Sequence, residues 1–85
     1  MYRIYFDSNE ADADGRENLG IPGSLKDIEP IASELKDGIR VLLYDFDRGE
    51  VEAILEYDGQ HHRWMARPIW ETFREIEDHS AKSLR

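Results

Sequence analysis

The centre of the chain carries runs in which apolar and polar side chains alternate with a period of two residues. In "VEAILEY" (51–57) every odd-numbered position is apolar, whereas Glu52 and Glu56 lie on the opposite face. "IRVLLYDF" (39–46) alternates in the same way, and "RWMARPI" (63–69) follows the turn "DGQHH". Such alternation, with acids on one face, is typical of half-buried antiparallel strands. The short turns between the three runs therefore predict an antiparallel meander.

The N-terminal part predicts a further strand and then a long loop. "YRIYF" (2–6) is rich in β-branched and aromatic residues and would place Ile4 and Phe6 on one face. Residues 8–23 are rich in Asp, Asn, Glu and Gly, with almost no apolar content before Leu19. We expect an acidic loop over 8–23.

The stretch "SLKDIEPIASELKDG" (24–38) predicts a broken helix. Ser24 can cap a helical turn, with Asp27 as the partner in a capping box. Pro30 argues against one continuous helix, because its ring clashes with the preceding turn. A first turn to about Glu29 and a second turn that Pro30 opens and Gly38 ends fit the pattern better.

The C-terminal part, "PIWETFREIEDHS" (68–80), has two interpretations. Trp70, Phe73 and Ile76 recur every three residues, which favours an amphipathic helix over 69–79. The alternative is a tight turn over 68–71 that leads into a short strand over 72–76. We expect the helix, and we expect residues 80–85 to fray.

Together these elements predict one domain over 1–85 of the α+β class, mostly β. The meander would curl into a small partial barrel, completed by the first strand and closed by the C-terminal helix. The expected core residues are Ile4, Phe6, Leu25, Ile28, Val41, Leu43, Ala53, Leu55, Met65, Phe73 and Ile76.

Residues 34–68, from "ELKDG" to "RWMARP", resemble a Src-homology-3-like small β-barrel. In such barrels a turn that ends in Gly, here Gly38, leads into a strand with an apolar residue three positions later, here Val41. The acidic-aromatic first loop of the peptide-binding branch is not matched. The resemblance therefore implies a barrel architecture and no binding specificity.

Composition bears on the class of protein and its compartment. The 85 residues include no Cys, which excludes disulfides and thiolate chemistry. The first residues lack the pattern of a signal peptide, and no stretch approaches the ~20 apolar residues of a membrane span. Small secreted domains usually need disulfides, so we expect a cytoplasmic protein with no membrane association.

The charge is acidic and unevenly distributed. The net charge of −8 divides into −5 over residues 1–38, −4 over 39–60 and +1 over 61–85. Such a chain repels a phosphate backbone, so nucleic-acid binding is not expected. The acid excess is typical of a solvated surface, and alternatively it indicates a basic protein partner.

Metal and catalytic sites find little support in the residues. In "EADADGREN" the acids Glu10, Asp12 and Asp14 precede Gly15 as in a calcium loop, but the twelfth position is Ile21 instead of Glu. The adjacent His61 and His62 would point to opposite sides of an extended chain. No serine lies at a motif spacing from a histidine. We therefore expect no metal, no cofactor and no enzymatic activity, while weak cation binding by residues 10–18 stays open.

The stretch "HHRWMARP" (61–68) combines positive charge with a large aromatic residue. Either Met65 or Trp64 points into the core, and the pattern leaves this choice open. Because Trp and Arg are favoured binding anchors, we predict a contact edge formed by Arg63, Trp64, Arg67 and Trp70.

Two functions follow as hypotheses. The first is a small noncovalent protein-interaction or accessory module that uses this edge. The alternative is an acidic inhibitor or immunity-type protein that neutralises a basic partner with Asp12, Asp14, Glu52 and Glu56. The sequence indicates neither the identity of the partner nor the oligomeric state.

Overall fold

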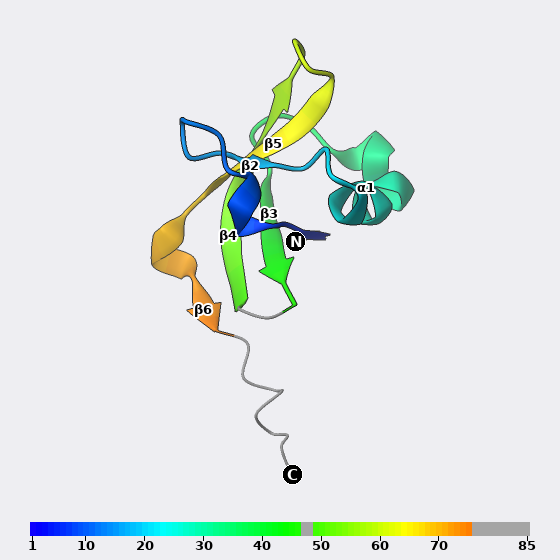
Figure 1. Cartoon of the computed structure of the whole chain (residues 1–85). Helices are drawn as coiled ribbons and strands as arrows, with labels where there is room; N and C mark the ends of the chain where they lie inside the picture. The colour runs from blue at the N-terminus through cyan, green and yellow to red at the C-terminus, as the bar shows by residue number, and fades with distance from the viewer. Residues whose placement is uncertain (47–48, 76–85) are drawn as a thin grey trace.

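The computed structural model of the chain describes residues 1–46 and 49–75. In this part of the chain a curled sheet is accompanied by one short α-helix (Figure 1). The strands are β1 (Arg3–Tyr5), β2 (Glu17–Asn18), β3 (Arg40–Asp45), β4 (Gly49–Asp58), β5 (Arg63–Pro68) and β6 (Arg74–Glu75). The helical segments are α1 (Pro22–Ile28) and the 3-10 turns η1 (Ser8–Glu10), η2 (Glu29–Glu34) and η3 (Trp70–Thr72).

The predicted meander is confirmed. β3 pairs antiparallel with β4, and β4 pairs antiparallel with β5. The sheet runs in the order β1-β3-β4-β5-β2, and β6 pairs with the first residues of β4. The sheet curls into a half-barrel, so that one face is concave and encloses the core (Figure 1).

β1 joins the sheet in parallel to β3, with Ile4 opposite Leu43. The outer edge of β1 is covered by α1, which lies beside it. The Tyr5 amide donates a hydrogen bond to Asp27 Oδ2 at 2.9 Å, and the Ser24 hydroxyl donates to the Tyr5 carbonyl. The prediction that Ser24 caps the helix is therefore wrong. The helix begins two residues earlier at Pro22, a residue suited to a first turn because its missing N–H has no partner there anyway.

The helical region is broken at the predicted place. α1 ends at Ile28, and η2 begins at Glu29 and contains Pro30 in its first turn. The earlier helix start, however, changes which side chains are buried. Ser24 and Ile28, four residues apart, face the core, whereas Leu25 points outward and is 48% exposed.

Most of the predicted core is buried as expected. The buried members of the prediction are Ile4, Phe6, Ile28, Val41, Leu43, Ala53, Leu55 and Met65. The prediction is wrong for Leu25 and Phe73, because both side chains are exposed. Ile76 lies outside the described residues. The core also contains Leu19, Leu35, Val51 and Ala66.

The helix lies in the middle of the chain and not at the C-terminal end, so the predicted helix over 69–79 is wrong for the described residues 69–75. β4 extends beyond the end of β5 and offers further backbone groups along the same edge. The Ile69 amide donates to the Glu52 carbonyl at 2.8 Å, and the Glu52 amide donates to Thr72 Oγ1 at 2.8 Å. This pairing holds the chain along β4 as a 3-10 turn followed by the short strand β6, close to the alternative interpretation.

The predicted acidic loop over 8–23 contains more structure than expected. It holds η1, the strand β2 and the start of α1. Glu17 pairs with Ala66 of β5 and is 2% exposed, so this acid faces the core. No helix among the described residues is both long enough and apolar enough to cross a membrane.

Candidate functional site

The predicted contact edge divides between the two faces of the sheet. Trp64 packs against the core, and its ring meets Tyr57 edge-on with the centroids 4.9 Å apart. Arg63 and Arg67 alternate with Trp64 along β5 and therefore lie on the convex face. Met65, on the convex face, and Ala66, on the concave face, are both buried, so β5 is covered on its two sides.

Arg67 contacts two of the four predicted acidic residues, Glu56 through its carboxylate and Asp14 through its backbone carbonyl. Its guanidinium lies 2.9 Å from Glu56 Oε2 and 3.3 Å from the Asp14 carbonyl oxygen. Arg16 continues the network, at 3.3 Å from Glu56 and 3.1 Å from Asp12. The fourth acid, Glu52, pairs separately with Arg40 at 2.9 Å.

The contacts of Asp12 and Glu56 favour the ionised forms of these two acids. Hydrogen bonds from Arg16, first through its backbone amide, lower the pKa of Asp12. The side-chain hydrogen bond from Arg67 lowers the pKa of Glu56. The carboxylate of Asp12 also accepts the Asp14 amide, and no group of three or more possible metal-ligating side chains occurs in residues 1–46 and 49–75. The acidic face is therefore a compensated charge network.

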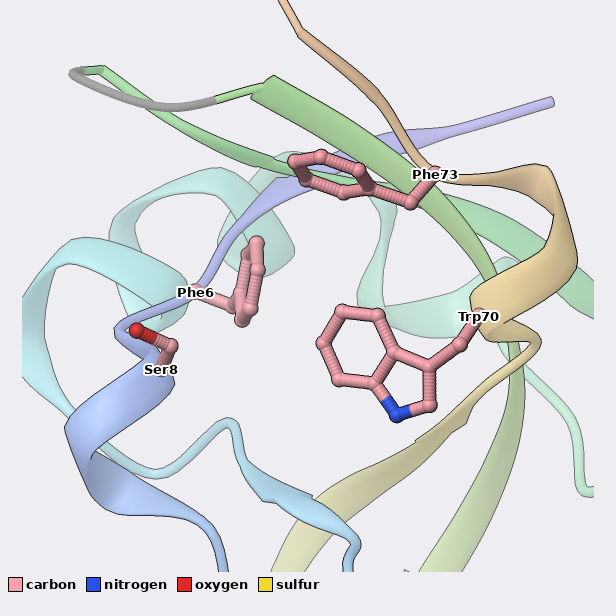
Figure 2. A pocket seen from close by; sticks show the side chains of 4 residues that line it. All are labelled: Phe6, Ser8, Trp70 and Phe73. Carbon is pink, nitrogen blue, oxygen red and sulfur yellow. The ribbon is translucent and has the colours of Figure 1, made fainter.

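Trp70 lies apart from the other three predicted residues and lines an apolar cleft. The cleft has a volume of about 290 Å³ and is lined by Phe6, Ser8, Trp70 and Phe73. Figure 2 shows the Trp70 ring pointing toward Phe6 across the opening, with Phe73 above both. Phe6 is buried at 3% exposure and forms the floor, whereas Trp70 and Phe73 remain 53% and 41% exposed.

Local structure explains why these side chains meet. Phe6 directly follows β1 and points to the concave face with Ile4, two residues earlier. Trp70 and Phe73 are three residues apart across η3, where a repeat of three places side chains on one side. Their ring centroids are 6.3 Å apart. The sequence singled out Trp70, but the cleft was missed because Phe6 and Phe73 had both been assigned to the core.

A buried acid lies near the segment that carries the cleft. Glu17 Oε1 has no hydrogen-bond partner within the described part of the chain. Burial, and then the negative charges of Asp7 and Asp12, raise the pKa of Glu17 to about 7. The strand β2, which carries Glu17, is in contact with η1, which carries Ser8.

In comparisons with protein-family models, with curated proteins and with solved structures, no match to this chain was found. The function has to be argued from the geometry of the chain itself.

Proposed function

We propose that the protein is a small noncovalent interaction or accessory module whose contact site is the cleft of Phe6, Trp70 and Phe73. The observation that carries this proposal is the exposure of two large aromatic side chains around a buried aromatic floor. Leaving this area in water forgoes the gain of about 25 cal/mol per Å² that burial would give. Contiguous exposed apolar surface of this kind is typical of a contact site.

The size of the cleft favours a side chain as its occupant. Pockets for small molecules usually measure about 300–1,000 Å³, and this cleft, at about 290 Å³, lies at the lower limit of that range. One bulky aliphatic or aromatic side chain from a partner chain suits this volume. Trp70 is well placed as an anchor, because tryptophan is enriched among the residues that dominate binding energy.

The residues next to the lining residues in the chain favour a basic partner. Asp7 follows the floor residue Phe6, and Glu71 follows Trp70, whereas Arg74, which follows Phe73, is already paired with Glu50. The whole chain carries a net charge of −8. We therefore propose that the partner is a protein with an extended segment in which one bulky apolar residue is flanked by Lys or Arg.

The test is a selection from a random peptide library, followed by fluorescence polarisation with the enriched peptides. We expect enrichment of one bulky apolar residue next to Lys or Arg. Phe73→Ser should lower the affinity for these peptides by about ten-fold or more, because the substitution removes an anchor ring. Phe46→Ser is the matched control, since Phe46 is also an exposed aromatic residue but does not line the cleft. Equal binding by wild type and Phe73→Ser, or no enrichment, would refute the proposal.

The alternative of an acidic inhibitor has less support. Asp12, Glu52 and Glu56 each pair with an arginine of the same chain, so their charges are partly compensated before any partner arrives. The Src-homology-3-like architecture over 34–68 also stays a proposal, consistent with the curled sheet and its meander.

A further inference from the structure

A second cavity lies on the opposite face of β1 and is built mainly from aromatic rings. Tyr5 and Phe46 stack with centroids 5.2 Å apart, and Tyr44 meets both rings edge-on at 5.8 and 5.5 Å. With Gly23, Lys26 and Asp27 from α1, these rings line a cavity of about 330 Å³. Phe46 is 77% exposed, so burial within this chain does not account for its position.

The cavity also contains a carboxylate that is held in place. Asp27 Oδ2 accepts hydrogen bonds from the Tyr5 amide at 2.9 Å and from the Tyr44 hydroxyl at 2.7 Å. Both bonds go to Oδ2, and no other described residue donates a hydrogen bond to Oδ1. The carboxylate is thus oriented by the protein and keeps one oxygen for a ligand.

We propose that this cavity binds an organic ammonium ion with its methylated head against the rings of Tyr5, Tyr44 and Phe46. Aromatic faces attract cations through their quadrupole, and poorly hydrated methylated ammonium groups use this attraction well. The Tyr44 ring already attracts one cation from outside the cavity lining, because the Arg3 guanidinium carbon lies 4.3 Å from its centroid, and this charge, like that of Lys26, opposes a second cation. Asp27 compensates the positive charge. The proposal goes beyond the protein-interaction function and uses a different surface.

Other ligand classes fit this cavity less well. An inorganic cation would need several oxygen ligands, and Asp27 is the one carboxylate among the described residues that line the cavity. An anion would meet Asp27 and a chain with a net charge of −8. Lys26 also lines the cavity and opposes a cation, so its removal gives a variant with a distinctive expected effect.

The test compares choline with 3,3-dimethylbutan-1-ol, a neutral isostere, by NMR titration of the full chain. We expect choline to shift the ring resonances of the three aromatic residues with a dissociation constant in the millimolar range. The isostere should bind about five-fold more weakly or worse, because it lacks the charge. N-acetyl-trimethyllysine amide distinguishes the source: affinity equal to that of choline indicates a free ligand, and tighter binding indicates a methylated protein side chain.

Variants separate a cation site from a merely apolar pocket. Phe46→Leu keeps an apolar side chain without the ring. The affinity for choline should therefore fall by about five-fold, while the affinity for 3,3-dimethylbutan-1-ol should change by less than about two-fold. Lys26→Gln should tighten choline by about two-fold or more. Trp70→Ser, at the cleft on the other face, should leave choline binding unchanged. The proposal is overturned if choline and the alcohol bind equally, if Phe46→Leu has no effect, or if choline does not bind at up to about 0.1 M.

Discussion

Ionisation of Glu17 should make the protein less stable as the pH rises toward neutrality. Glu17 is 2% exposed and Oε1 has no partner among the described residues, so its charged form is disfavoured in the folded state. The pKa rises from the ordinary value of 4.5 to about 7 on folding. Below pH 4.5 the carboxyl is protonated in both the folded and the unfolded chain and has no differential effect. Above pH 7 the folded chain must hold a buried charge.

The magnitude follows from the two pKa values. Each pH unit between them changes the free energy of unfolding by ~1.4 kcal/mol. The interval from 4.5 to about 7 therefore removes about 3 kcal/mol of stability. For a domain with a total stability of about 5–15 kcal/mol, this loss is large.

The assay is urea unfolding of wild type and Glu17→Gln at half-unit steps from pH 4 to 8. A glutamine cannot ionise, so the difference in the free energy of unfolding between variant and wild type should move in favour of the variant by about 3 kcal/mol over this interval. Glu10→Gln is the matched control, since Glu10 is exposed and should leave the wild-type profile unchanged. Parallel profiles for wild type and Glu17→Gln would refute the reasoning.

Substitutions at three positions test the backbone of the fold by thermal unfolding. Gly49→Ala should lower the free energy of unfolding by about 1–3 kcal/mol, because the alanine Cβ would lie 2.2 Å from the Arg74 carbonyl oxygen and push β6 away. Unchanged stability would contradict this contact. His62→Gly should stabilise by about 1 kcal/mol, because His62 adopts a φ of 54° that glycine accepts without strain; a loss of stability would count against it. Thr72→Val should cost about 1–3 kcal/mol, because it leaves the Glu52 amide without its acceptor, whereas Thr72→Ser should cost less; equal losses would show that the hydroxyl does not matter.

The meander could be predicted because its information is local. Val51, Ala53 and Leu55 alternate with Glu52, Ile54 and Glu56, and antiparallel neighbours with short turns follow from that pattern alone. The strand β2 could not be predicted in this way, because two residues carry no period. Its position depends on pairing with Met65 and Ala66, which lie more than forty residues away.

The C-terminal segment shows how a long-range contact overrides a local pattern. The three-residue spacing of Trp70 and Phe73 suits a helix, and it equally suits a single 3-10 turn. The 3-10 turn forms because the amide and carbonyl of Glu52 in β4 hydrogen-bond with this segment. The cleft was missed for the same reason, because it forms only when this turn is held opposite Phe6.

The sealed edge of β1 has a consequence for self-association. An edge strand with unsatisfied amide and carbonyl groups can template the addition of a strand from another molecule. Here Asp27 and Ser24 occupy the outward amide and carbonyl of Tyr5, so an incoming strand would find these groups taken. At the other side of the sheet, Glu17 of the two-residue strand β2 is already bridged to Ala11 on its outer edge. The same two side chains that attach α1 to the sheet should therefore hinder the addition of a strand at Tyr5.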